Sequence, residues 1–237
     1  ERAGTFRPGL LTRLSPNLER INKISDSQWA YGRNRAIRIP TAIVELQGWL
    51  DDYSLHANGL FNTPDFPEIG LELTGNGNLA SLQINNLTIR GLDGSLAVAG
   101  KLSWQPEVSW DLKLQAAHVD PGVYWKNWPG RLAMQGLIEG KYSADTLESS
   151  LQIDSLTGTL RDYPLQASGD VSLKNGQWFS QGLRLKLGKN IITLSGSIGD
   201  TIAAQWDARL PNLAALWPGL GGQLVGQGRL ESKTLRL

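Results

Sequence analysis

Acid–base chemistry in this chain would have to come from two histidines, His56 and His118, or from the adjacent carboxylates Asp51 and Asp52. His56 is out of phase with the apolar residues around it, which predicts a place on the exposed face of a strand. His118 stands two residues before an Asp-Pro pair that is typical of a helix start. Neighbouring strand residues point to opposite faces, so Asp51 and Asp52 fit a turn better than a catalytic pair. We therefore expect no catalytic residue and no enzyme.

The composition also argues against metal, cofactor and nucleic-acid sites. The 237 residues include no Cys and two His, which excludes zinc fingers, iron–sulfur clusters and multi-histidine metal sites. Gly94–Lys101 and Gly182–Lys189 have the outline of a phosphate loop, but no Ser or Thr follows either lysine. The net charge is +1, and the eight basic residues of 1–40 form no dense stripe with interleaved aromatic residues. We expect no metal, no cofactor and no nucleic-acid partner.

From residue 41 onwards, apolar and polar residues alternate with a period of two, which predicts short strands with one apolar and one wet face. Val108, Trp110, Leu112 and Leu114 are one such series. Pairs typical of hairpin turns separate the segments, at Asn85-Asn86, Asp93-Gly94, Asn175-Gly176 and Gly199-Asp200. The pattern predicts an antiparallel meander. Because strong amphipathic helices are lacking, the sheet must curl on itself into a barrel, a sandwich or a trough.

Helical spacing occurs in three places. Leu10–Ile24, inside a basic segment over residues 1–40, could form an amphipathic face, although Pro16 interrupts it. Asp120-Pro121 and Asn212 are N-cap signals that each open a short helical turn. Both turns end in Trp-Pro-Gly, at Trp128 and Trp217.

The two Trp-Pro-Gly turns belong to an internal repeat. Trp110-Asp111 returns as Trp206-Asp207, and each Trp-Pro-Gly is followed by a glycine-rich strand. The shared order predicts a first β repeat over residues 41–142 and a second, continuous with it, over residues 143–237.

The repeat also carries a family resemblance. Val108–Leu112, Trp128–Leu132 and above all Leu210–Leu230, with its Trp-Pro-Gly-Leu-Gly-Gly run, resemble the TamB family of the AsmA-like, bridge-type lipid transfer group. The resemblance covers residues 41 to 237 and implies a segment from the middle of the periplasmic region of a much longer protein. It implies an elongated antiparallel sheet folded like a taco, an open groove with an apolar interior, and short helical turns.

The resemblance further implies a function. Family members are thought to carry phospholipid between the inner and outer membranes and to support outer-membrane protein assembly. The partners would be phospholipid acyl chains and, through regions outside this chain, the outer-membrane barrel TamA. The parent would be anchored in the inner membrane by a segment absent here, with this chain in the periplasm. Strand edges left unpaired could also cause edge-to-edge self-association.

The residues expected to line the groove are apolar and alternate along the strands. They are Leu82, Ile84, Leu96, Val98, Leu102, Trp104, Val108, Trp110, Leu112, Leu114, Leu183, Leu185, Leu187, Ile192, Leu194 and Trp206. Trp125, Trp128 and Trp217 lie in the helical turns and are expected to narrow the groove.

Two other functions fit part of this pattern. A non-conducting scaffold for outer-membrane protein assembly or secretion would have the same composition. A carbohydrate-binding β protein would also use Trp and Asn, but the regular coils of a β-solenoid and a facing pair of acids are missing.

Overall fold

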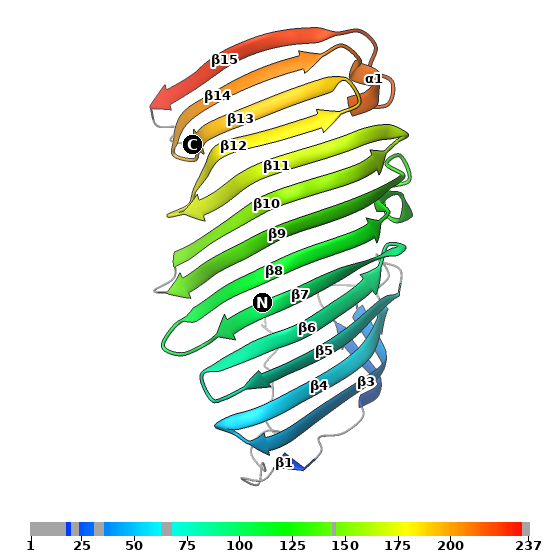
Figure 1. The fold of residues 1–237 in the computed structure, drawn as a ribbon, viewed down its shortest axis with the longest axis vertical. Helices are drawn as coiled ribbons and strands as arrows, with labels where there is room; N and C mark the ends of the chain where they lie inside the picture. Colours follow the sequence, from blue (N-terminus) through cyan, green and yellow to red (C-terminus); the bar gives the residue numbers. More distant parts are fainter. Residues whose placement is uncertain (1–17, 20–23, 31–35, 63–67, 144–145, 234–237) are drawn as a thin grey trace.

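A computed structural model of the chain describes residues 18–19, 24–30, 36–62, 68–143 and 146–233, and the side chains of residues 39–62, 68–143 and 146–232. Its strands form one antiparallel sheet in the order β1-β3-β4 and then consecutively to β15, while β2 pairs with β3 beside β1. The strands are β1 (Leu18–Glu19), β2 (Ile24–Ala30), β3 (Ala36–Trp49), β4 (Asp52–Asn62), β5 (Ile69–Gly77), β6 (Ser81–Gly91), β7 (Gly94–Ser103), β8 (Val108–Val119), β9 (Gly130–Ser143), β10 (Thr146–Leu160), β11 (Tyr163–Lys174), β12 (Gln177–Leu187), β13 (Asn190–Ile198), β14 (Thr201–Leu210) and β15 (Leu224–Lys233). Figure 1 shows the elongated, curled sheet, which does not close on itself. The fold class predicted from the sequence is confirmed.

Two short helical elements interrupt the meander at the same edge of the sheet (Figure 1). The 3-10 turn η1 (Pro121–Val123) joins β8 to β9, and the helix α1 (Leu213–Leu216) joins β14 to β15. The Asp120 carboxylate caps η1 by accepting from the amide of Gly122 at 2.7 Å, as its position predicted. Asn212 is the N-cap residue of α1, as its position predicted, although its side chain makes no cap hydrogen bond.

Strand register carries the alternation across the whole sheet, because residues paired on neighbouring strands share a face. Leu82 pairs with Leu102, which pairs with Trp110, whereas the intervening Lys101 pairs with Asp111. The same separation holds as far as β15. One face of the sheet, the apolar face, is therefore lined mostly by aliphatic and aromatic residues, and the other, the polar face, mostly by charged and amide residues.

β-Bulges keep this separation intact over strands that are long for a globular sheet. Asn85-Asn86 is not the predicted hairpin turn: β6 runs through it, with a register shift between Ile84 and Leu87. Ile84 and Leu87 are three positions apart, which in a regular strand would put their side chains on opposite faces. One extra, bulged residue returns Leu87 to the face of Ile84. A similar β-bulge follows Ile153 in β10.

The described parts of residues 18–40 are strands. β1 and β2 both pair with β3, which starts at Ala36 and crosses the expected segment boundary at residue 40. Of the helical face expected over Leu10–Ile24, the described positions, 18–19 and Ile24, are in strands, since pairing with β3 satisfies their backbone. The rest of that expectation, with all of residues 1–17, lies outside the described residues.

Candidate functional site

The apolar face is the candidate functional site, because it holds nearly all of the residues predicted from the sequence. By register, fifteen of the sixteen predicted lining residues lie on this face, namely Leu82, Ile84, Leu96, Val98, Leu102, Val108, Trp110, Leu112, Leu114, Leu183, Leu185, Leu187, Ile192, Leu194 and Trp206. Trp104 lies past the end of β7, where its indole N–H donates to the carbonyl of Leu79 at 2.7 Å. The predicted residues thus come from strands β6–β8 and β12–β14.

One side of the apolar face is covered by α1, and we name it the covered margin. Its centre is the pair Leu165 and Leu187, which are 5% and 3% exposed and pack with Ala215 of α1. Around them pack Leu132, Leu156, Leu160, Tyr163, Leu185 and Leu216. The covered margin is therefore a hydrophobic core that α1 shields from solvent.

The opposite side of the same face is exposed, and we name it the open margin. It consists of one residue near the other end of each strand from β8 to β13: Val108, Tyr142, Leu147, Leu173, Trp178 and Ile198. Tyr142 is 46% exposed, Trp178 52% and Ile198 44%. Register joins them in two groups of three, Val108–Tyr142–Leu147 and Leu173–Trp178–Ile198, which meet diagonally because Leu173 pairs with Ser149. Soluble proteins rarely display an apolar stripe of this extent without a binding role. Of these six residues, only Val108 was predicted to line the groove. The other five stand at strand ends, where the sequence does not show which residues of the neighbouring strand they pair with.

Aromatic rings lie flat over glycines on the apolar face. A Cβ at Gly140 would come within 2.5 Å of the Trp110 ring, and one at Gly228 within about 3 Å of the Trp206 ring. Only glycine leaves room for these rings, which therefore lie along the sheet instead of standing up from it. Tyr53 approaches Gly77 in the same way, and burial raises the pKa of the Tyr53 phenol.

Two of the three tryptophans of the helical turns, Trp128 and Trp217, contact each other at the edge of the covered margin. Trp128 contacts Trp217 edge to face, with ring centroids 5.8 Å apart, and the Arg161 guanidinium lies 5.5 Å from the Trp128 ring centroid. Trp125 is 59% exposed and contacts Tyr124 instead. Trp128 and Trp217 are 89 residues apart in sequence (217 − 128), so their two loops are joined by a side-chain contact that no local pattern could reveal.

Polar anchors hold α1 on the apolar face. Asn190, 1% exposed, donates its amide to the carbonyl of Asn212 at 2.7 Å and accepts from the Asn212 amide at 3.0 Å. Arg161 donates to the carbonyls of Ala214 and Ala215 at 3.0 and 3.2 Å. These bonds satisfy backbone groups that α1 would otherwise leave unpaired near the sheet. Neither Asn190 nor Arg161 was singled out from the sequence.

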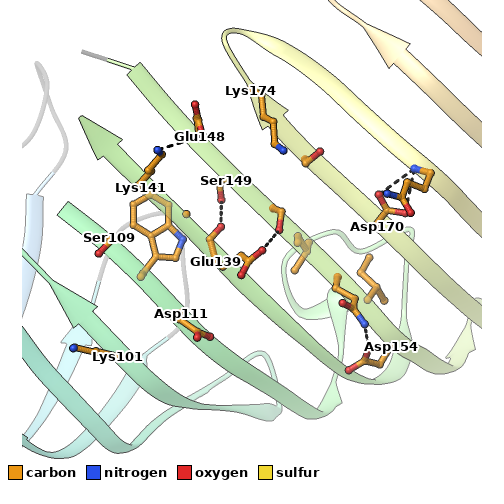
Figure 2. A pocket seen from close by; sticks show the side chains of 18 of the residues that line it. Lys101, Ser109, Asp111, Glu139, Lys141, Glu148, Ser149, Asp154, Asp170 and Lys174 are labelled. Carbon is orange, nitrogen blue, oxygen red and sulfur yellow. Dashed lines mark hydrogen bonds and ion pairs between the residues drawn. The ribbon is translucent and has the colours of Figure 1, made fainter. Parts of the chain in front are cut away.

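The polar face of the sheet has a broad hollow. A depression of about 1070 Å³ extends over strands β7 to β12, with lysines and carboxylates around it (Figure 2). The Lys141 Nζ on β9 lies 3.8 Å from Oε2 of Glu148 on β10. Asp170 accepts hydrogen bonds from the amides of Gln181 and Gly182, which the bulge in β12 frees from the ladder.

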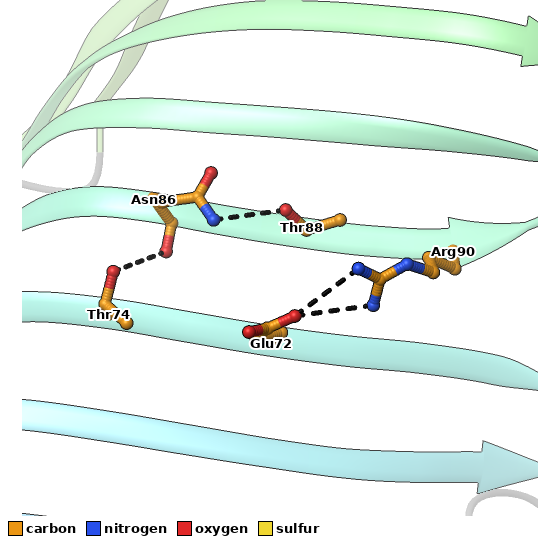
Figure 3. Close-up of polar contacts among 5 residues, drawn as sticks. All are labelled: Glu72, Thr74, Asn86, Thr88 and Arg90. Atoms are coloured by element: carbon orange, nitrogen blue, oxygen red, sulfur yellow. Dashed lines mark hydrogen bonds and ion pairs between the residues drawn. The ribbon is translucent and has the colours of Figure 1, made fainter.

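Similar polar contacts line this face between β5 and β6 (Figure 3). Arg90 donates to Glu72 at 3.4 Å, and Asn86 donates to the Thr88 hydroxyl at 3.2 Å. Both partners of the ion pair are well exposed, so its contribution to stability is small. The arrangement is that of a solvated sheet surface.

The two histidines and the Asp51-Asp52 pair, which were considered for acid–base chemistry, lie in different parts of the sheet. His56 lies on the polar face opposite Glu45 and Thr74, while His118 is exposed, with a positive φ of 59°, at the bulge before η1. Asp51 is in the turn between β3 and β4. Within the residues that the structure describes, no three His, Cys, Asp or Glu side chains gather closely enough to hold a metal ion. In the same residues, neither helical element has the length and hydropathy of a membrane-spanning helix.

Comparison with known proteins identifies the family. The family model described as "TamB, N-terminal domain" matches residues 22–235. The chain is 24% identical over 193 residues to the translocation and assembly module subunit TamB of Haemophilus influenzae, a match that covers 81% of this chain and 15% of that protein. No solved structure matches the chain. Because the family model spans nearly all of the sheet, the chain belongs to the TamB N-terminal domain family.

Proposed function

We propose that the apolar face carries phospholipid acyl chains between the inner and outer membranes, as one segment of an envelope-spanning protein that supports outer-membrane protein assembly. The observation that supports this most is the continuity of the face: register keeps apolar residues on one side from β4 to β15 through several bulges. A hydrocarbon chain requires continuous apolar surface and no hydrogen-bonding groups.

The energetics suit a conduit better than a tight site. Each methylene that leaves water gains about 0.8 kcal/mol wherever it lies on such a surface. A chain therefore binds with similar strength at successive strands, as movement along the sheet requires. In this proposal the protein performs no reaction, and the turns with Trp125, Trp128 and Trp217 narrow the groove at the edge of the covered margin.

The rest of the parent protein supplies the ends of the route. The chain spans about a seventh of the relative, whose name describes a subunit of a translocation and assembly module. We place this chain in the periplasm, with an inner-membrane anchor and a contact to the outer-membrane barrel TamA lying in other parts of the parent.

Substitution of Leu112 tests the proposal. Leu112→Arg in the full-length parent places a charge on the apolar face, and burying an ionised group against acyl chains costs several kcal/mol. We expect this variant, at normal abundance, to lose phospholipid transfer between the membranes.

Lys113→Glu is the matched control, because residue 113 is the next position on the same strand and lies on the polar face. It should transfer phospholipid like the unaltered protein. Normal transfer by Leu112→Arg would favour a non-conducting assembly scaffold instead. The broad depression of the polar face, with its mixed charges, would then be the natural surface for a protein partner.

A further inference from the structure

The two margins of the apolar face differ in how far their side chains are exposed to solvent. Leu165 and Leu187 of the covered margin are almost fully buried beneath α1, whereas Trp178 and Ile198 of the open margin are about half exposed. Both margins draw residues from the same strands, β9 to β12. A molecule bound to this part of the face can therefore use only one of them while α1 is seated.

The covered margin shows what a peptide needs in order to bind this face. α1 is fixed there by Asn190, which bonds Asn212 in both directions, and by Arg161, which caps two of its carbonyls. Such anchors are required because an unpaired buried backbone group costs free energy.

The open margin offers no such anchors. Its six residues carry no amide, guanidinium or carboxylate group. The strands β8 to β13 are each paired on both sides, so a peptide cannot add to the sheet here as a further strand. The stripe instead runs across the strands for about 24 Å at a spacing of about 4.8 Å. One leaflet of the hydrocarbon core is about 15 Å thick, so a whole acyl chain fits along it.

We propose that phospholipid acyl chains pass β8–β13 over the part of the apolar face that runs from the open margin to the strand centres, which includes Leu112 and Leu114 of β8, and that α1, held by Arg161 and Asn190, keeps them off the covered margin. This rests on the proposed conduit function and specifies its route. Leu185 and Leu187, which the sequence placed in the groove lining, then belong to the support of α1 and are not in contact with lipid.

Photo-crosslinking tests the route in the full-length parent. A benzophenone amino acid replaces Ile198 on the open margin, Leu187 on the covered margin or Lys186 on the polar face, and the purified protein is mixed with vesicles of phosphatidylethanolamine and phosphatidylglycerol. We expect Ile198 to capture phospholipid at least about tenfold more than Leu187, equivalent to about 1.4 kcal/mol. Leu187 and Lys186 should both stay at background.

Arg161→Ala then tests the role of α1, with Arg184→Ala on the polar face as its control. Releasing α1 should raise capture at Leu187 toward the level at Ile198, and Arg184→Ala should not change it. Equal capture at Leu187 and Ile198 in the otherwise unaltered protein would overturn the route while leaving the conduit standing. Background capture at all three positions would overturn the conduit itself. Unchanged capture at Leu187 in a folded Arg161→Ala protein would remove α1 as the cause, and the first comparison still decides the route if that variant does not accumulate.

Discussion

At the scale of single residues, glycine determines where strands approach closely and where rings lie flat. Gly100 has a φ of 144°, and a Cβ there would collide with the carbonyl oxygen of Asp111 on β8. Gly140 and Gly228 leave room for the rings of Trp110 and Trp206. Composition shows that the chain is rich in glycine, with 27 residues, but only the register shows which of them face a ring or a neighbouring backbone.

Gly100→Ala should destabilise the 237-residue chain by about 1–3 kcal/mol, because alanine is strained at this φ and its Cβ meets the Asp111 carbonyl. The free energy of unfolding in urea measures the change. Gly221→Ala is the control, since a Cβ at Gly221 meets nothing within 4 Å, and it should stay within about 0.5 kcal/mol of the unaltered chain. Equal effects of the two substitutions would contradict this account of the β7–β8 contact.

At the scale of elements, Asp120 organises the connection between β8 and β9. Its Oδ1 accepts hydrogen bonds from the amides of Gly122 and Gly130, at 2.7 and 2.8 Å. One carboxylate thus starts η1 and fixes the first residue of β9, which brings Trp128 to the edge where Trp217 meets it.

Asp120→Ala should cost about 1–2 kcal/mol of stability, because both amides lose their acceptor. Asp120→Asn keeps an acceptor oxygen and should recover most of the loss. Thermal unfolding followed by tryptophan fluorescence compares the two variants. If asparagine were as damaging as alanine, the carboxylate would act through its charge and not as a cap.

Much of the element structure was predictable because its signals are local. β8 begins at Val108, and Val108, Trp110, Leu112 and Leu114 lie on one face of it as their alternation predicts. Asp93-Gly94 and Asn175-Gly176 form the expected turns. The bulge at Asn85-Asn86 was mistaken for a turn because Asn-Asn favours both, although the odd spacing of Ile84 and Leu87 was a usable signal. The seating of α1 could not be predicted, since Arg161 and Ala215 meet only through the curvature of the whole sheet.

At the scale of the whole molecule, we propose that residues 41–142 and 143–237 are two copies of one unit. The aromatic-over-glycine pairs Trp110–Gly140 and Trp206–Gly228 occupy corresponding strand pairs, and both Trp-Pro-Gly turns lie at the same edge. The sheet runs through the join without interruption, so each copy extends the apolar face of the other.

A sheet that grows by adding strands ends in a strand able to pair with another chain. β15 is the last strand of the order, and Val225 on it is 77% exposed. We expect this 237-residue chain to self-associate through β15 as its concentration rises, as sedimentation velocity can measure. Val225→Lys should weaken the association by charge repulsion, and the β-branched control Val225→Thr should preserve it. A monomer at every concentration would contradict pairing through this edge.

The central claim is that one face of the sheet contacts lipid and the other does not. Photo-crosslinking at each position from Ser109 to Gln115 along β8, in the full-length parent in its native envelope, tests it most directly. The account predicts capture of phospholipid with a period of two: strong at Trp110, Leu112 and Leu114 and at background at Ser109, Asp111, Lys113 and Gln115, whose side chains lie on the polar face. Capture without this alternation, or at none of the seven positions, would contradict it.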